Sequence, residues 1–344
     1  MTAASLILLC FVLSLAGSDL VRRYAVSHGV IDIPNARASH VVPTPRGGGV
    51  AIVVAFTVCS IAFIALGDAP NWLASILGPG LLIAAVGALD DRFGLPPSIR
   101  LIVHFATAAW ALWAVNGLAP IEFGDSVVDL GLLGNVLAVV GLVWSLNLFN
   151  FMDGIDGIAS VETITVCLAG ACLSYLKSGL VDWIPPMLLT AAAAGFLVRN
   201  FPPARIFMGD AGSCFLGFAI GLFCIISGHQ HSSFLWMWLI LLGGFVTDAT
   251  VTLIRRAIRR ERIWGAHRSH AYQHAAIVLR SHRTVTLGVG LINILWLFPI
   301  AAAVVFEKIP GTLGSLMAYV PLVVLAIYLN AGGAETSRKH SDAS

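Results

Sequence analysis

Long apolar segments separated by short polar loops run through almost the whole chain. Eleven of them have the roughly 20 mostly apolar residues that a membrane-spanning helix needs. Because open sheet edges cannot face lipid, each segment is predicted to be an α-helix. The sequence therefore predicts an all-α, polytopic integral membrane protein. The segments are residues 3–21, 48–66, 72–89, 99–118, 132–149, 158–176, 184–198, 211–228, 234–253, 284–306 and 313–330.

The composition excludes other classes of protein. Of the 344 residues, 58 % are apolar and 11 % are charged, against about 25 % charged residues in an average soluble domain. Too few charges remain to cover a water-soluble surface. The formal net charge of +2 gives no basic footprint for nucleic acid, so we expect no nucleic-acid partner.

Basic residues favour one orientation in the membrane. Alternate loops and the C-terminal tail carry 18 of the 20 Lys and Arg residues, and only Lys177 and Lys308 lie on the other side. By the positive-inside rule, the N-terminus is outside and the C-terminus is cytoplasmic. Because Arg22 and Arg23 follow the first apolar segment, we expect an uncleaved helix rather than a signal peptide.

The six cysteines all lie in apolar segments, and none forms a Cys-x-x-Cys pair. They are predicted to be small buried apolar residues rather than a metal site or a disulfide framework. They are Cys10, Cys59, Cys167, Cys172, Cys214 and Cys224.

Two adjacent carboxylates, Asp90 and Asp91, end the third segment. Like charges at a membrane boundary repel each other unless a cation or a proton-transfer role offsets the repulsion. The alternative is a hydrated helix end with Arg92 as a local partner, although a carboxylate there opposes the helix dipole.

A second polar cluster follows the fifth segment. Asn147, Asn150 and Asp153 recur every three residues, and Asp156 continues the series. Oxygen ligands without basic partners suit Mg²⁺ or Mn²⁺ together with a substrate phosphate. An Asp-Gly turn is the alternative, but a turn does not explain two asparagines in an apolar helix.

Two further clusters fall in predicted cytoplasmic loops. Asp210 precedes small residues at the start of a helix. It can cap this helix, or the backbone N–H groups and the dipole at the helix N-terminus can bind phosphate beside it, or both. His267, Arg268, His270 and His274 follow a run of arginines. Zinc on three histidines is open, but anion binding fits better beside the other clusters. The arginine run itself is predicted to flank a membrane span.

Together, these clusters indicate metal-assisted phosphoryl transfer to a lipid at the cytoplasmic surface. The main alternative is a transporter or flippase for an anionic or lipid-linked solute, which would place polar groups near the bilayer midplane. Asp248, inside the ninth segment, is a partial exception and is interpreted as a partner for Arg255 or Arg256.

The chain resembles the polyprenyl-phosphate N-acetylhexosamine-1-phosphate transferases, of glycosyltransferase 4 type. The matching motifs are Asp90-Asp91, Asn150-Phe-Met-Asp153-Gly-Ile-Asp156-Gly157, Phe207-Met-Gly-Asp210 and the stretch His267-Arg268-Ser269-His270. The first loop, Asp32 to His40 and Pro43 to Gly49 with Arg46, is similar to members that start O-antigen or other surface polysaccharides. Gly94 departs from members that carry an acid or a lysine there, which puts any role of that side chain in doubt.

The resemblance implies an enzyme that transfers an N-acetylhexosamine-1-phosphate from a UDP-sugar to undecaprenyl phosphate and releases UMP. It implies a catalytic domain over residues 1–331, a disordered tail over 332–344, and a multi-pass protein of the bacterial inner membrane. The active site would face the cytoplasm, among membrane lipids.

The same resemblance implies a role for each motif residue. Asp210 and Asn150 would hold Mg²⁺, with Mn²⁺ as an alternative, and Asp90 with Asp91 would orient or deprotonate the lipid phosphate. Asp156 would bind uracil and Phe207 would stack on it. His267, Arg268 and His270 would engage the pyrophosphate or sugar, and Asn147, Asp153 and Arg46 complete the substrate-binding set.

Several alternatives stay open at this stage. The sequence does not identify the sugar, or decide between direct transfer and an aspartyl intermediate. It leaves the oligomeric state open, with a homodimer among the alternatives. A CDP-alcohol phosphatidyltransferase is disfavoured because the segment from Asp153 to Ala159 lacks the arginine of that signature.

Overall fold

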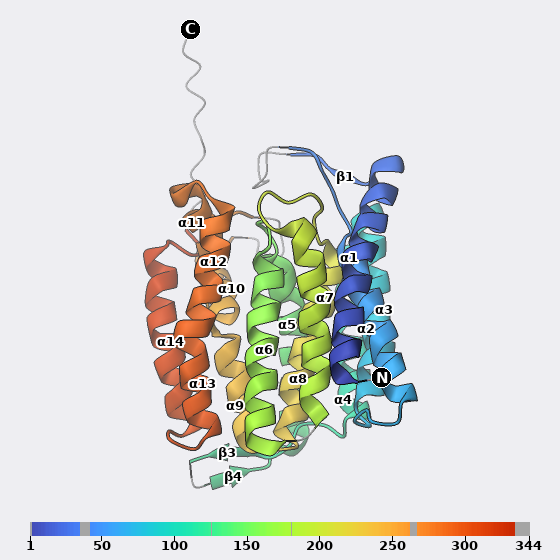
Figure 1. Ribbon diagram of the computed structural model, residues 1–344. Helices are drawn as coiled ribbons and strands as arrows, with labels where there is room; N and C mark the ends of the chain where they lie inside the picture. The colour runs from blue at the N-terminus through green and yellow to red at the C-terminus, as the bar shows by residue number, and fades with distance from the viewer. Residues whose placement is uncertain (1, 35–41, 125, 180, 262–266, 334–344) are drawn as a thin grey trace.

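A computed structural model describes residues 2–34, 42–124, 126–179, 181–261 and 267–333. Its helices run roughly side by side in one bundle (Figure 1). The first eight are α1 (Ala3–Ser27), α2 (Gly49–Ala65), α3 (Leu73–Phe93), α4 (Pro97–Ala114), α5 (Gly131–Met152), α6 (Ile158–Ser178), α7 (Ile184–Asn200) and α8 (Asp210–Gly228).

The helices after α8 are more broken. The helix pair α9 and α10 is bent by 64°, at a junction that contains two glycines, Gly243 and Gly244. A π-helical segment, η2, interrupts the next span between α12 and α13. The elements are α9 (Ser232–Leu241), α10 (Gly243–Ile258), α11 (Ala271–Leu279), α12 (His282–Ile292), η2 (Asn293–Leu297), α13 (Phe298–Val305) and α14 (Gly311–Tyr328), with a 3₁₀ turn η1 (Val181–Trp183) before α7.

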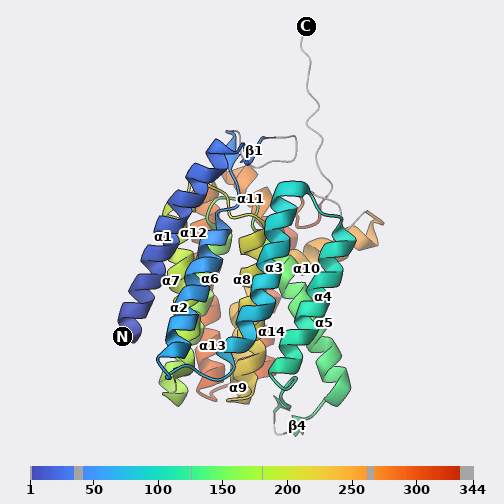
Figure 2. The ribbon, with the colours of Figure 1, turned by 90° about the vertical axis from the view of Figure 1, so that its right-hand side faces the viewer.

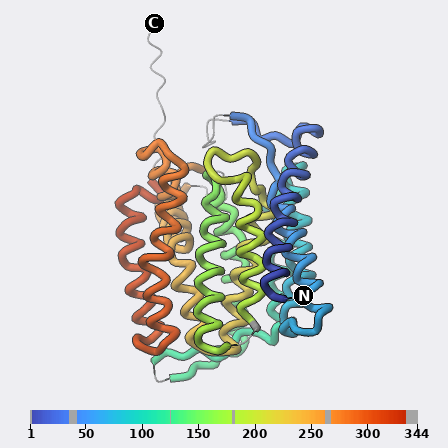
Figure 3. Tube along the Cα trace, viewed as in Figure 1, coloured from blue at the N-terminus to red at the C-terminus, as the bar shows by residue number. Residues whose placement is uncertain are grey.

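Short hairpins lie at the two ends of the bundle. Strand β1 (Ile31–Asp32) pairs antiparallel with β2 (Thr44–Pro45), and β3 (Ile121–Phe123) pairs with β4 (Ser126–Val128). Strand β1 and α11 lie at one end, here called the α11 end, whereas β3, β4 and the N-terminus lie at the other (Figures 1 and 3).

Some predicted features lie outside the described residues. They are Asn35 to His40 of the first loop, Arg262 to Ala266 of the ninth loop, and residues 334–344 of the predicted tail.

Helix α8 runs through the middle of the bundle, beside α3 (Figure 2), and it packs against both α3 and α5. Every residue from Asp210 to Ser227 is buried. Small residues allow the neighbouring helices to approach closely. Ser145 of α5, for example, donates a hydrogen bond of 2.6 Å to the carbonyl of Gly217. The close packing fixes the start of α8 relative to α3 and α5.

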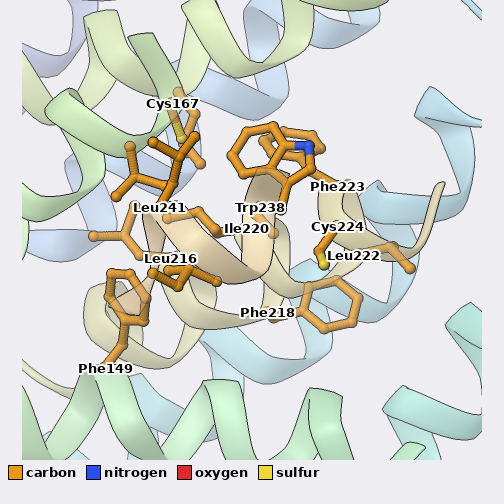
Figure 4. Packing of buried hydrophobic residues seen from close by; sticks show 14 of the residues in the cluster. Phe149, Cys167, Leu216, Phe218, Ile220, Leu222, Phe223, Cys224, Trp238 and Leu241 are labelled. Carbon is orange, nitrogen blue, oxygen red and sulfur yellow. The ribbon is translucent and has the colours of Figure 1, made fainter. Parts of the chain in front are cut away.

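Apolar side chains of α5, α6, α8 and α9 fill the space around α8 (Figure 4). Trp238 of α9 is 2 % exposed and lies among them. A Cβ on Gly170 of α6 would lie 2.6 Å from the Trp238 ring, so a glycine is needed at this contact. This packing joins the C-terminal helices to the centre of the bundle.

The prediction of an all-helical polytopic membrane protein is confirmed. Seven described helices are long and apolar enough to span a membrane, and the bent pair α9–α10 raises the number to eight. Helices α2 and α7 have 17 residues each, and α4 carries Arg100 and His104 among its 18. The eleven predicted segments all contain helix, although three of them fall short of the stricter test.

The prediction for the cysteines is correct for five of the six. All six are free thiols, but Cys172 is exposed, so its prediction as a buried residue is wrong. Cys172 lies on α6, and an exposed cysteine on a spanning helix can face lipid without any loss of apolar burial.

Candidate active site

Asp91 closes the N-terminus of α8. Its carboxylate accepts hydrogen bonds from the backbone N–H groups of Asp210, at 2.9 Å, and Ala211, at 3.4 Å. Gly209 precedes the helix and has no side chain to cap it. The partial positive charge of a helix N-terminus stabilises a carboxylate. Helix α8 thus offsets the unfavourable free energy expected for a carboxylate at the end of α3.

Asp210 is the first residue of α8, and its carboxylate binds two guanidinium groups. Asp210 Oδ1 lies 2.6 Å from Arg46 Nη2, and Oδ2 lies 2.9 Å from Arg100 Nη1. Because α8 has no side-chain cap of its own, the interpretation of Asp210 as a simple N-cap is wrong. The buried carboxylate points instead toward charged groups from two other segments.

Asp90 shares Arg100 with Asp210. Arg100 Nη1 contacts Asp90 Oδ2, and Asp90 Oδ1 accepts a hydrogen bond of 2.6 Å from the backbone N–H of Leu95. The guanidinium group therefore bridges a carboxylate of α3 and a carboxylate of α8. Residues far apart in the sequence converge at the α11 end of the bundle, as the motifs predict.

The interpretation of Arg92 as the local partner of Asp90 is wrong. Arg92 Nη1 lies 3.5 Å from the hydroxyl of Tyr24, and its guanidinium carbon lies 5.4 Å from the ring centre of Phe93. The sequence analysis missed Arg100, which holds this place. An arginine near the start of an otherwise apolar helix was the available signal.

The first loop delivers Arg46 to the same cluster by pairing with the segment before α8. The N–H of Phe207 donates to the carbonyl of Pro45 at 2.8 Å, and the N–H of Gly48 donates to the carbonyl of Phe207 at 2.9 Å. Arg46 Nη2 also lies 2.9 Å from Asp91 Oδ1. Phe207, a predicted substrate contact, thus also holds Arg46 in place through its backbone.

Only one of the two predicted asparagines reaches α8. Asn150 Nδ2 donates to Ser213 Oγ at 3.2 Å, three residues after Asp210. Asn150 Oδ1 has no hydrogen-bond partner among the described residues. Asn147 instead donates to the carbonyl of Val143 in its own helix, at 2.7 Å. The structure therefore brings Asn150, but not Asn147, to the first turn of α8, which begins at Asp210.

Asp153 is the carboxylate that stays without a partner. Within the described part of the chain, its side chain makes no hydrogen bond and no ion pair. Burial raises the pKa of Asp153 well above its usual range; the positive charge of Arg46 opposes the shift, whereas the carboxylates of Asp210, Asp91 and Asp156 add to it. Asp153 therefore lies close enough to Arg46, Asp91 and Asp210 for their charges to affect its pKa.

Asp156 faces a separate cavity. Its Oδ2 accepts a hydrogen bond of 3.0 Å from the N–H of Ala204, and its Oδ1 lies 3.4 Å from His282 Nδ1. The cavity beside it has a volume of about 850 Å³ and carries three arginines. Its lining includes Asp156, Pro202, Arg268, Gln273, Arg280 and Arg283.

The predicted histidines form a stacked pair before α11. The ring centres of His267 and His270 are 5.0 Å apart, and Ser269 Oγ lies 3.0 Å from His267 Nδ1. Burial, together with the positive charges of His270 and Arg256, lowers the pKa of His267 to about 3. His267 is therefore neutral near physiological pH and can offer a hydrogen bond but no positive charge.

The described residues contain no group of three or more His, Cys, Asp or Glu side chains arranged to hold a metal ion. The alternative of zinc on His267, His270 and His274 finds no support in this part of the structure. Any divalent cation would need ligands beyond these residue types, such as an asparagine oxygen or a substrate phosphate.

The interpretation of Asp248 as a partner of Arg255 or Arg256 is wrong. Arg255 Nη1 donates to the carbonyl of Ala331 at 2.6 Å, and Arg256 Nη1 lies 3.2 Å from Ser269 Oγ. Both arginines tie α10 to the segments around it. Asp248 has other partners.

Comparison with known proteins gives one family and several relatives. Residues 73–228 match the family model "Glycosyl transferase family 4". A probable undecaprenyl-phosphate N-acetylglucosaminyl 1-phosphate transferase of Bacillus subtilis is 29 % identical over 300 residues, which cover 83 % of this chain and 80 % of that protein. An undecaprenyl-phosphate alpha-N-acetylglucosaminyl 1-phosphate transferase of Yersinia pestis is 28 % identical, over 96 % of this chain and 90 % of its own. A decaprenyl-phosphate N-acetylglucosaminephosphotransferase of Mycolicibacterium smegmatis is 27 % identical, over 90 % and 83 %.

Proposed function

Residues 73–228 match the model of glycosyl transferase family 4, and from this match we propose that the protein transfers N-acetylglucosamine-1-phosphate from UDP-N-acetylglucosamine to undecaprenyl phosphate. The names of the relatives from Bacillus subtilis and Yersinia pestis support this donor and acceptor. The product would start a lipid-linked surface polysaccharide of the O-antigen kind.

One observation carries the proposal: Arg100 bridges Asp90 and Asp210, and Arg46 bridges Asp91 and Asp210. Three carboxylates, those of Asp90, Asp91 and Asp210, face two guanidinium groups in one cluster. This excess of negative charge suits a bound cation.

The residues present fit a magnesium ion. Asp153 has no partner, and Asn150 keeps its amide oxygen free within the described residues, so two hard oxygen ligands are available beside Asp210. Asp210, Asn150 and Asp153 would hold the ion. A bound Mg²⁺ would neutralise negative charge on the diphosphate.

The reaction joins two anions. An oxygen of the lipid phosphate forms a new bond to the sugar-bearing phosphorus of the donor. The bond from that phosphorus to the bridging oxygen breaks, and UMP leaves with its electron pair. Arg46 and Arg100 can exchange carboxylate oxygens for phosphate oxygens and so reduce the repulsion between the substrates. Asp90 is proposed to act on the lipid phosphate, and Asp91 to hold Asp210 in place.

The donor is proposed to extend from the carboxylate cluster toward the cavity beside Asp156. Arg268 lines that cavity and supplies positive charge for the diphosphate. Asp156 and Phe207 are proposed to bind uracil, and His267 and His270 the diphosphate or sugar.

The proposed arrangement has eleven spans in a bacterial inner membrane, with the α11 end in the cytoplasm. The N-terminus lies at the opposite end from α11 (Figure 1), which agrees with an odd number of spans. Arg46, Arg100 and Arg256 all contact residues at the α11 end, as the positive-inside rule requires of a cytoplasmic face.

The test is UMP release in membranes supplied with UDP-N-acetylglucosamine, undecaprenyl phosphate and Mg²⁺. Asp210→Asn is expected to abolish transfer while the protein still inserts and folds, because the buried charge between two arginines is lost. Asp68→Asn, an exposed aspartate between α2 and α3, is the matched control. Turnover by Asp210→Asn at the wild-type rate would remove Asp210 from the reaction. Solute movement without UMP release would favour a transporter instead.

A further inference from the structure

A buried carboxylate inside α10 holds the start of α11. Asp248 is 6 % exposed. Its Oδ1 accepts a hydrogen bond of 2.9 Å from the backbone N–H of Ala271, and its Oδ2 accepts one of 2.9 Å from Tyr272. Thr252 Oγ1, one turn along α10, lies 3.1 Å from Oδ1. The carboxylate therefore satisfies the first two N–H groups of α11.

Asp248 also sets the protonation of a predicted substrate-binding histidine. His270 Nδ1 lies 3.2 Å from Asp248 Oδ1. An ionised carboxylate only accepts hydrogen bonds, so Nδ1 carries the proton. In the neutral ring, Nε2 is then the acceptor; among the described residues the side chain contacts Asp248 and, in a capping box, the backbone N–H of Gln273. The ring thus keeps one nitrogen for a ligand.

Aromatic contacts hold the same ring in one plane. The ring of His270 stacks with Tyr272, at 5.6 Å between centres and an interplanar angle of 27°, and with Phe151, at 6.4 Å and 29°. Phe151 belongs to the segment between Asn150 and Asp153. His270 therefore rests against the loop that carries two of the proposed cation ligands.

Tyr272 joins α11 to that loop directly. Its hydroxyl donates a hydrogen bond of 2.9 Å to the carbonyl of Phe151. A Cβ on Gly154 would overlap the Tyr272 hydroxyl, so the contact requires a glycine. The chain of contacts runs from Asp248 to α11 and from α11 to the loop between Asn150 and Asp156.

We propose that Asp248 is a positioning residue that fixes His270 with Nδ1–H toward Asp248 and Nε2 toward the donor diphosphate, and that seats α11 on the Asn150–Asp156 loop. This proposal rests on the proposed function. The proposed role differs from that of a simple helix cap, because a cap would stabilise α11 without acting through His270.

The kinetic test compares Asp248→Asn, His270→Gln and the double variant. Asparagine keeps the size of the side chain but removes the negative charge that attracts the Nδ1–H of His270, so it weakens that hydrogen bond. Each single variant is expected to raise KM for UDP-N-acetylglucosamine about tenfold and to change kcat less. The double variant is expected to raise KM no further, because both changes remove one function.

Thr252→Val is the matched control. It removes a hydrogen bond to the same carboxylate without touching His270, so KM is expected to stay at the wild-type value. Additive effects of Asp248→Asn and His270→Gln on KM, or an unchanged KM in Asp248→Asn, would overturn the proposal.

A second measurement does not depend on activity or on the folding of Asp248→Asn. Nitrogen NMR of ¹⁵N-histidine-labelled wild-type protein at alkaline pH reports the tautomer of each neutral ring, and the spectrum of His270→Gln assigns the signal. The Nδ1–H tautomer is expected for His270, and the Nε2–H tautomer overturns the proposal. Absence of UMP release by the wild-type protein would contradict the proposed function but leave this result standing.

Discussion

Asp91 and Asp248 each cap the N-terminus of a helix, and they do so in two regions of opposite charge. Each places a buried carboxylate on the first two backbone N–H groups of a helix that belongs to another segment. Asp91 holds α8, which presents the carboxylate of Asp210. Asp248 holds α11, which presents the ring of Tyr272 beside His270.

The surroundings of the two carboxylates differ. Asp91 lies among Asp90, Asp153 and Asp210, and two arginines only partly offset this charge. Asp248 pairs with His270, and the cavity beside α11 carries three arginines. The site thus has an acidic half that suits a cation and a basic half that suits a diphosphate.

The comparison teaches that the same kind of contact can serve either half of a charged site. What each region does depends on the groups that the capped helix presents, not on the capping carboxylate itself. Five substitutions test whether the two regions differ in this way.

Of these substitutions, Asp91→Asn is expected to have the largest effect. The amide loses the charge that pairs with Arg46 and one of the two acceptors that hold α8, so kcat for UMP release should fall about 100-fold. UMP release and protein yield in detergent are measured together. Asp129→Asn, in an exposed loop near the β3–β4 hairpin, should leave both unchanged. Near-normal turnover by Asp91→Asn would mean that activity does not require the Asp91 carboxylate at the N-terminus of α8.

Gly209→Ala should also lower activity, by disturbing the same contact from the other side. Gly209 has a φ of +79°, and a Cβ there would overlap the Asp91 carboxylate. With a ψ of 173°, this backbone conformation is one that essentially only glycine adopts, and it costs about 1–3 kcal/mol for alanine.

Gly94→Ala introduces backbone strain from a positive φ without any new contact, so it is the control for Gly209→Ala. Gly94 has a φ of +66° with open space around it, so alanine there should lower the melting temperature without a loss of kcat. Equal kcat in the Gly209 and Gly94 variants would show that strain, not the Asp91 contact, matters.

A moderate effect is expected for Gly154→Ala in the basic half. The new Cβ would meet the Tyr272 hydroxyl and push α11 away from the loop, so UMP release should fall about tenfold. Adding Tyr272→Phe removes the hydroxyl and should restore part of the rate. If the double variant is no faster than Gly154→Ala, α11 does not act on the loop through this contact.

The smallest effect concerns His267. Its pKa is lowered to about 3 in the folded protein, whereas an unfolded histidine titrates near about 6.5. The unfolded chain therefore binds the extra proton between these values, and stability should fall as the pH drops below about 6.5. His267→Gln should show a smaller loss of melting temperature from about pH 7 to about pH 5. An identical loss in both proteins would show that His267 is charged in the folded state.

Much of the fold could be predicted from the sequence. Eleven apolar segments all contain helix, because a backbone in lipid must satisfy its own hydrogen bonds. The 64° bend between α9 and α10 could not be predicted, since apolar residues continue through Gly243 and Gly244 and the hydropathy pattern does not change there. The exposed position of Cys172 could not be predicted either, because the apolar pattern does not say which face of a helix packs against its neighbours.

The motif acids were visible in the sequence because polar residues at the ends of apolar helices need an explanation. Asp90 and Asp210 share Arg100, and Asn150 reaches the same helix, α8, at Ser213. Arg100 was missed because a single basic residue near a helix start has an ordinary interpretation as a membrane flank. Asp248 was assigned the wrong partners, since its neighbours in sequence are arginines and its neighbours in space are His270 and α11.

The class of protein, the helical segments and the chemistry of the motif loops can all be derived from the order of the amino acids. Hydrophobic burial in lipid and the chemistry of oxygen ligands depend on residue types and their local spacing. The partner of each charge becomes visible only in the folded molecule: Arg100 with Asp210, Asp91 with the start of α8, and Asp248 with His270. Those pairings form between helices, so they depend on how the helices pack and not on their order along the chain.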